Sequence, residues 1–112
     1  TSHDFKCTGG SKIICYKEIF FGKEVLISWE TTIIDTDFHN IFLENELINK
    51  NEQISIMDNV WIGFGVKVLK GSFIPTGSVI GSNSIISKKL QHKNSIYVED
   101  GKVIRKNINW KI

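Results

Sequence analysis

The chain has 112 residues, a formal net charge of +2, two cysteines and one proline. This length suits one small domain and leaves no room for a second. There are 19 Ile and 7 Val against 5 Leu and no Ala, and because β-branched residues favour strands, the composition predicts an all-β fold and excludes a helical bundle. No apolar run reaches the roughly 18 residues of a membrane span and the first residues lack a signal-peptide pattern, so we expect a cytoplasmic protein.

Charge is distributed unevenly along the chain. Residues 1–56 carry a net charge of −4, whereas residues 57–112 carry +6. The basic half is compatible with a phosphorylated ligand, but its basic residues are spread out rather than clustered with aromatic ones, which argues against nucleic acid as a partner. Cys7 and Cys15 lack the C-x-x-C spacing, so we interpret them as reduced structural thiols.

The first repetitive segment consists of three six-residue units that begin at Phe21, Ile27 and Ile33, with Cys15 as an earlier member. A second run begins at Ile56, 23 residues after Ile33, which is not a multiple of six. An insertion must therefore lie between the two runs, and the polar stretch 39–53 is the candidate. A loop of that length in a small domain usually has a function.

The second run has a large aliphatic residue at every sixth position, namely Ile56, Ile62, Val68, Ile74, Ile80 and Ile86. Small or β-branched residues follow four positions later, and each is preceded by a residue tolerant of positive φ: Asn59, Gly65, Gly71, Gly77 and Asn83. A short strand and a turn make one side of a triangular coil, so three hexads make one coil. The pattern predicts a parallel β-solenoid over residues 15–88, with coils about 4.8 Å apart that are stable only when stacked.

Residues 89–112 break the repeat but keep apolar side chains at Tyr97, Val98, Val103, Ile104, Ile108 and Trp110. We expect this segment to form a short strap that packs over the last coil and covers its open edge.

Three motifs together resemble the hexapeptide-repeat acyltransferases: the run 60–66 (VWIGFGV), the loop sequence 35–39 (DTDFH) and the run 80–88 (IGSNSIISK). The resemblance covers about residues 19–110 and implies a left-handed parallel β-helix. It also implies a homotrimer that binds acetyl-CoA between neighbouring solenoids, with the loop of one subunit closing over the site. The acceptor would be a sugar, free or linked to a nucleotide or lipid, of the surface-polysaccharide type.

The resemblance places the catalytic histidine at His39. Neutral imidazole is a suitable base for a sugar hydroxyl, which is a poor nucleophile until it loses its proton. Asp37 would orient that imidazole, and Asp35 would contact the acceptor. Trp29, on the hexad just before the loop, is a candidate for stacking on a sugar ring, whereas Trp61 is expected to serve packing.

For the donor, the resemblance maps backbone contacts to Phe64, Gly65, Ser82 and Asn83, and phosphate contacts to Lys88, Lys102 and Arg105. The N–H of Gly65 is also a candidate donor to the oxyanion of the tetrahedral intermediate. Two prolines that relatives carry are missing, one soon after Lys88 and one near residues 98–102, so the sequence leaves the path of the tail open.

Three alternatives compete with this interpretation. A zinc-dependent carbonic anhydrase has the same solenoid but needs three converging histidines, and His3, His39 and His92 are far apart in the sequence; no metal is expected. A rigid interaction scaffold would leave the loop without a catalytic role. An N-acetyltransferase that acts on an amino sugar would use the same donor and base.

Overall fold

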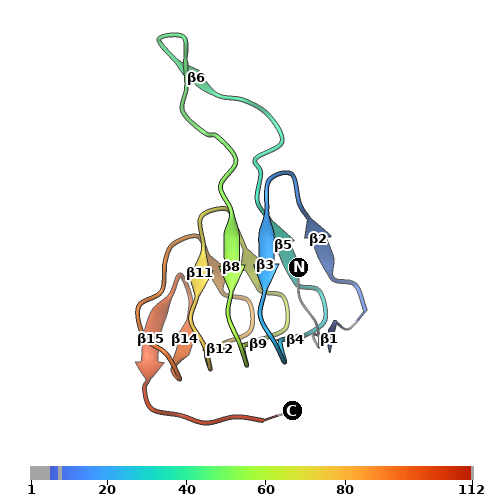
Figure 1. Cartoon of the computed structure of the whole chain (residues 1–112), viewed down its shortest axis with the longest axis vertical. Coiled ribbons are helices and arrows are strands. Elements are labelled where there is room, and N and C mark those ends of the chain that lie inside the picture. The colour runs from blue at the N-terminus through green and yellow to red at the C-terminus, as the bar shows by residue number, and fades with distance from the viewer. Residues whose placement is uncertain (1–5, 8, 112) are drawn as a thin grey trace.

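The structure, a computed structural model, describes residues 6–7 and 9–111, with side chains from residue 9 onward. The described strands wind into a triangular parallel β-helix, and a long loop projects from one edge (Figure 1). Residues 9–111 contain no helix, and therefore none that could cross a membrane. The predicted all-β solenoid is confirmed; the calls that fell on residues 1–5, 8 and 112, such as His3, lie outside the described residues.

The solenoid has three faces, which we name A, B and C. Face A has the strand order β1 (Lys6–Cys7), β4 (Leu26–Ile27), β9 (Trp61–Ile62), β12 (Val79–Ile80), β14 (Ile96–Val98) and β15 (Lys102–Arg105). Face B has β2 (Lys12–Ile14), β5 (Thr32–Ile34), β10 (Lys67–Val68) and β13 (Ile85–Ile86). Face C has β3 (Ile19–Phe21), β8 (Ile54–Ile56) and β11 (Phe73–Ile74), and a separate hairpin in the loop pairs β6 (Phe42–Leu43) with β7 (Glu46–Leu47).

The hexad positions form the core, as the spacing predicts. The six aliphatic residues of the second run have no exposed surface, and Ile27 and Ile33 of the first run have none either. Parallel pairing keeps them in register, because Ile62 pairs with Ile80 and Val68 pairs with Ile86. Removing each such side chain from water contributes on the order of 2 kcal/mol.

The corners of the triangle use the expected turn residues. Asn59, Gly65 and Asn83 have φ of 56°, 69° and 63°, and Gly71 and Gly77 are also positive. A serine buried at a corner is satisfied by the backbone: the hydroxyl of Ser72 donates to the carbonyl oxygens of Leu69 (2.6 Å) and Ile86 (2.9 Å). Buried polar groups of this kind stabilise the fold only when they are hydrogen-bonded.

The inserted loop is longer than the sequence predicts. An ordinary coil has 18 residues, as the pairing of Val68 with Ile86 shows. Ile33 pairs with Val68, 35 residues further on, so the second coil carries 17 extra residues. The loop spans residues 35–53, because β5 ends at Ile34 and β8 begins at Ile54. The predicted insertion 39–53 lies within this loop, and residues 35–38 before it occupy the place of an ordinary four-residue corner.

Both ends of the solenoid also differ from expectation. The first coil begins at β1, and Ile13, not Cys15, pairs with Ile33; Cys15 lies in a corner turn. At the other end, β14 continues face A, and β15 pairs with it in the antiparallel direction and so covers the sheet edge. The last residues then run back beneath the solenoid (Figure 1), where the Trp110 indole N–H donates to the carbonyl oxygen of Asn59 at 2.8 Å.

Candidate functional site

The base of the loop lies at the corner between faces B and C, which we call corner BC (residues 15–18, 35–53, 69–72 and 87–88). The loop leaves the end of β5 and returns to the start of β8, so both legs meet the same corner (Figure 1). This corner carries the residues that the sequence singles out as catalytic.

Asp35 is fully buried at this corner. Its carboxylate accepts N–H bonds from Tyr16 (2.7 Å), Lys17 (2.8 Å) and Glu18 (2.7 Å), which form the corner turn of the first coil. Burial raises the pKa of Asp35, but these backbone bonds, with the Cys15 thiol, lower it more, so its pKa lies below the usual range. The expected acceptor contact of Asp35 is therefore corrected, because its oxygens hold the adjacent coil and are closed to solvent.

Asp37 has its partners on the loop and on the next coil. Its carboxylate lies 2.8 Å from Lys70 Nζ and accepts a hydrogen bond from the Asn49 side chain at 3.0 Å. These contacts lower the pKa of Asp37, the Lys70 hydrogen bond most of all. Asp37 was expected to orient the imidazole of His39, but its carboxylate instead binds Lys70 and the Asn49 side chain.

His39 follows a residue with an unusual backbone conformation. Phe38 has a φ of 71°, which a bulky residue adopts only when its surroundings impose it, and its ring packs edge-to-face against Tyr16 at 5.8 Å. The His39 N–H donates to the Asp37 carbonyl at 2.8 Å, and Asn49 Nδ2 donates to the His39 carbonyl at 2.8 Å. The backbone of His39 is thus fixed on both sides while its side chain is exposed to solvent.

Asn49 connects the two legs of the loop. Besides its bonds to Asp37 and His39, its Oδ1 accepts the N–H of Ile41 at 2.6 Å. Asn49 and Lys70 are site residues that the sequence motifs do not predict. Asn49 lies outside the repeat and the motif 35–39, and Lys70 lies in the hexad that begins at Val68 but at none of its patterned positions. Only the return of the loop to this corner shows their role.

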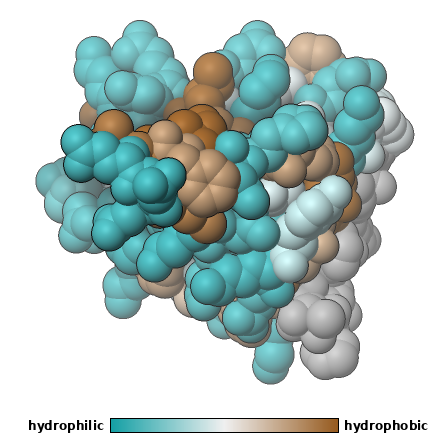
Figure 2. All heavy atoms as spheres, turned by 90° about the horizontal axis from the view of Figure 1, so that it is seen from above, coloured by the Kyte–Doolittle hydropathy of each residue, from teal (hydrophilic) through white to brown (hydrophobic). Residues whose placement is uncertain are grey.

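The outer part of the loop is apolar and exposed. Seen from the loop end, apolar side chains gather within a largely hydrophilic surround (Figure 2). Exposed apolar patches of this kind on a folded chain mark interaction surfaces. The exposed apolar residues of the loop are Phe38, Ile41, Phe42, Leu43, Leu47 and Ile48.

The residues expected to contact the donor through their backbone, Phe64, Gly65, Ser82 and Asn83, lie on a different corner, between faces A and B, which we call corner AB (residues 28–31, 63–66 and 81–84). Gly65 N–H donates to the Trp29 carbonyl at 3.0 Å, and Asn83 N–H donates to the Phe64 carbonyl at 2.7 Å, so successive turns are stacked. Trp29 and Phe64 are 60% and 47% exposed. The Gly65 N–H is therefore already engaged, and the expectation that it stabilises an oxyanion is corrected.

The stack at corner AB continues to Ser82 and then to the turn at Glu99 and Asp100, since Ile85 N–H donates to the Glu99 carbonyl at 2.8 Å. Lys88, Lys102 and Arg105 lie near this end of the solenoid and are exposed. Exposed cations suit the phosphates of a donor, although the two acidic residues reduce the net positive charge there.

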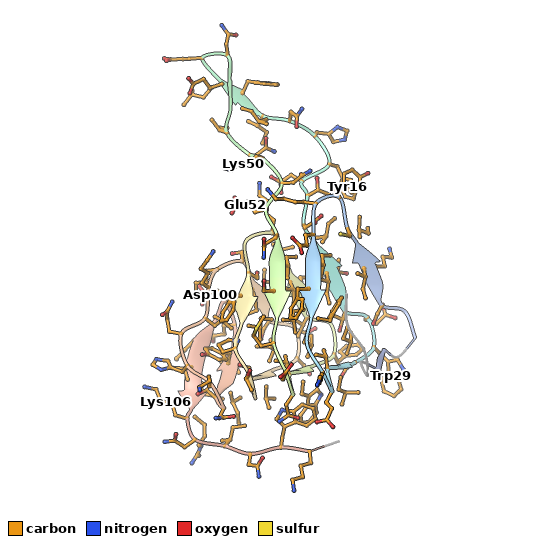
Figure 3. All side chains as sticks on the ribbon, in the orientation of Figure 1. Tyr16, Trp29, Lys50, Glu52, Asp100 and Lys106 are labelled. Atoms are coloured by element: carbon orange, nitrogen blue, oxygen red, sulfur yellow. The ribbon has the colours of Figure 1, made fainter. Side chains whose placement is uncertain are left out.

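Face B separates His39 from the predicted backbone contacts to the donor. His39 is at corner BC and the aromatic residues Trp29 and Phe64 are at corner AB, and Trp29 is far from the loop base (Figure 3). One chain therefore carries both halves of the expected site on different corners. Within residues 9–111, no three His, Cys, Asp or Glu side chains gather as a metal site would require.

The coils, corners and register define a left-handed parallel β-helix of the hexapeptide-repeat type. No family model matches the chain. A Schizosaccharomyces pombe protein named as an acetyltransferase is 31% identical over 109 residues, which cover 79% of this chain and 53% of that protein. The galactoside O-acetyltransferase of Lactococcus lactis is 37% identical over 75 residues, covering 65% of this chain and 36% of the enzyme.

Solved structures agree with these relatives. The polysialic acid O-acetyltransferase OatWY superimposes on 100% of this chain with a TM-score of 0.92 and 29% identity, over 55% of its own length. The resemblance to the hexapeptide-repeat acyltransferases is thereby confirmed, and this chain has their fold. The chain spans about half the length, or less, of the proteins it matches.

Proposed function

We propose that this protein transfers an acetyl group from acetyl-CoA to a hydroxyl of a sugar, with His39 as the general base. The observation that carries the proposal is the fixed backbone and exposed imidazole of His39, whose backbone is held by Asp37 and Asn49 at the base of the loop. The likeness to O-acetyltransferases supports it. A cytoplasmic location, where acetyl-CoA is available, is part of the same proposal.

The chemistry needs one base and no resident cofactor. The imidazole of His39 takes the proton from the acceptor hydroxyl as its oxygen attacks the thioester carbonyl carbon. When the carbon–sulfur bond breaks, the imidazolium returns that proton to the departing thiolate. The side chain is exposed and so reaches a large acceptor without first being uncovered.

We propose a homotrimer as the active form. His39 and the donor residues Phe64 and Ser82 lie on corners that face B separates, so a site that uses both sets takes one corner from each of two subunits. The apolar loop supports the same arrangement, because its exposed side chains would be buried against a neighbouring copy.

The acceptor is proposed to be a surface-polysaccharide type of sugar. Trp29 offers an exposed aromatic face for a sugar ring, and the similar OatWY is a polysialic acid O-acetyltransferase. The same base could acylate the amine of an amino sugar, and the linkage formed distinguishes the two reactions, because hydroxylamine cleaves an ester and leaves an amide intact.

The test measures thiol release from acetyl-CoA by the purified protein with a panel of oligosaccharides, including sialic acid oligomers. We expect acceptor-dependent release that falls at least a hundredfold in His39→Ala, the usual contribution of a general base. His92→Ala is the matched control, since this second exposed histidine contacts Tyr97 through its backbone. A folded trimer that neither binds acetyl-CoA nor transfers acetyl groups would favour the scaffold alternative.

A further inference from the structure

A cavity of about 440 Å³ lies on the outside of face C, beside the returning leg of the loop. Its lining includes Lys17 from the first coil, Lys50 and Glu52 from the loop, and Ser55 and Phe73 from β8 and β11. Lys50 and Glu52 project near the loop base (Figure 3). A volume of this order matches that of typical small-ligand pockets.

The strand register accounts for the hollow. Ser55 on β8 pairs with Phe20 on β3 and with Phe73 on β11, and all three side chains point outward between the buried core positions. A short serine between two phenylalanines leaves a gap in the surface. Ser55 and Phe73 both line the pocket, and the Ser55 hydroxyl accepts a hydrogen bond from the Gln53 side chain at 3.2 Å.

The charge of the pocket is positive. Lys17, Lys50 and Lys89 come from three separate segments, and Glu52 is the single acidic lining residue, so the lining carries +2. None of the three lysines takes part in an ion pair within residues 9–111. Free ammonium groups that converge from separate segments suit an anionic ligand.

The remaining lining narrows the chemistry of that ligand. The amides of Asn51 and Gln53, with the hydroxyl of Ser55, offer donors and acceptors for hydroxyl groups. Aromatic, amide and hydroxyl groups together match a sugar ring, and the lysines match a carboxylate on it. We propose that this pocket binds a carboxylate-bearing saccharide and forms an acceptor subsite separate from His39.

The position of the pocket relates it to the loop. Lys50 follows Asn49, whose side chain holds the His39 carbonyl at 2.8 Å, and the Lys50 carbonyl accepts a hydrogen bond from Lys70 at 3.0 Å. An acidic polymer seated on face C would therefore lie beside the base of the catalytic loop. The inference rests on the proposed function for its role in acceptor binding, but the binding itself does not require turnover.

The experiment compares two oligosaccharides of equal length, a tetramer of galacturonic acid and neutral maltotetraose, by calorimetric titration of the purified protein. We expect the acidic tetramer to bind more tightly and its affinity to fall with added salt. In the double variant Lys17→Glu/Lys89→Glu the affinity should drop at least tenfold. Lys23→Glu is the matched control, because this exposed lysine lies at the opposite edge of the solenoid.

A parallel titration with CoA tests whether the pocket binds phosphate groups instead of a saccharide carboxylate. CoA affinity should be the same in the double variant and in the wild type. Equal binding of the acidic and neutral tetramers, or unchanged binding by the double variant, would overturn the inference. A loss of CoA affinity in the double variant would overturn it too, by making the pocket a phosphate site. Acidic binding that persists in a protein without acetyl transfer would leave the pocket in place and refute the proposed function alone.

Discussion

The ammonium group of Lys70 holds both legs of the loop. It lies 2.8 Å from the Asp37 carboxylate on the outgoing leg and donates to the Lys50 carbonyl, 3.0 Å away, on the returning leg. Because Lys70 belongs to the corner of the third coil, these bonds connect the loop base to the rigid solenoid. The position of His39 therefore depends on a residue that is 31 positions later in the sequence.

Replacing Lys70 by methionine is expected to loosen the loop and leave the solenoid folded. Acetyl transfer should fall about three- to tenfold, since a general base must stay within hydrogen-bond reach of its substrate. Amide hydrogen exchange over residues 37–50 should become faster, while the melting temperature changes little. Lys67→Met is the control, because Lys67 lies exposed on face B. An equal effect of both changes would show that the contacts of Lys70 with Asp37 and Lys50 do not hold the loop.

The same contact predicts a pH effect on the loop. The folded pKa of Asp37 lies below its ordinary value of 3.8, so its ion pair is intact above that value and is lost as the pH falls through the folded pKa. Hydrogen exchange of the loop, corrected for its intrinsic pH dependence, should increase in that acidic range. In Asp37→Asn the loop should exchange at the faster rate at neutral pH as well.

Asp35 is expected to matter for stability. Asp35→Ala leaves the N–H groups of Tyr16, Lys17 and Glu18 without their acceptor in a buried corner, which should lower the free energy of unfolding by about 2–4 kcal/mol. Because the folded pKa of Asp35 is lowered, this contribution is present above pH 3.8 and disappears as the pH falls through the folded pKa.

Chemical denaturation of Asp35→Ala and Asp58→Ala checks this prediction. Asp58 makes a comparable bond to a single N–H, that of Lys23, on the exposed surface, so its replacement should cost about 1 kcal/mol or less. Similar losses in the two variants would show that the buried network around Asp35 adds nothing to stability.

The period of six was enough to predict the coil, because burial at every sixth position follows directly from the triangular geometry. Ile56 to Ile86 are buried in the expected phase, and the turn residues have the expected positive φ. The hexad pattern did not predict the first coil correctly. Two extra residues between Ile14 and Ile19 shift the first coil out of the six-residue phase, and Cys15 lies six residues before Phe21 without being a core position. A six-residue periodicity in the sequence does not reveal where two residues have been inserted.

The candidate site was harder to predict than the fold. The motif 35–39 identified the loop, but the roles of Asp35 and Asp37 depend on partners at Tyr16 and Lys70, which only the winding of the chain brings near. A carboxylate in a loop motif has the same appearance whether it is buried under three N–H groups or free. Only the burial of Asp35 and the long-range contacts of both carboxylates distinguish their roles in the structure.

A charge on the solenoid axis should unfold the protein. Ile62 and Ile80 are fully buried and paired in register, so Ile62→Asp or Ile80→Asp places a carboxylate among aliphatic side chains and should cost more than 4 kcal/mol. Lys50→Asp in the exposed loop should be nearly neutral. Circular dichroism during thermal unfolding measures the difference, and similar melting curves would mean that the phase of the hexads is wrong.

The returning tail should stabilise face A through Trp110. Its indole N–H bonds to the Asn59 carbonyl at 2.8 Å, and its ring lies 5.7 Å from that of Trp61. Trp110→Ala should lower the free energy of unfolding by about 1–3 kcal/mol. It should also expose the Trp61 ring to solvent, which shifts the Trp61 fluorescence to longer wavelength. Trp29→Ala, which removes an exposed ring, is the control; equal stability of the two variants would show that the tail is not held there.

The apolar hairpin of the loop should determine the oligomeric state. Phe42 and Leu43 are 61% and 63% exposed in one chain, and a neighbouring subunit that covers them would gain about 25 cal/mol for each Å² of apolar surface. The double variant Phe42→Asp/Leu43→Asp should therefore shift the protein from the proposed trimer to monomer in sedimentation experiments, with its β-sheet spectrum unchanged. Ile104→Asp, at another exposed apolar position on β15, should leave the trimer intact. If the double variant stays trimeric, the loop does not form the contact, and His39 and corner AB must meet by another route.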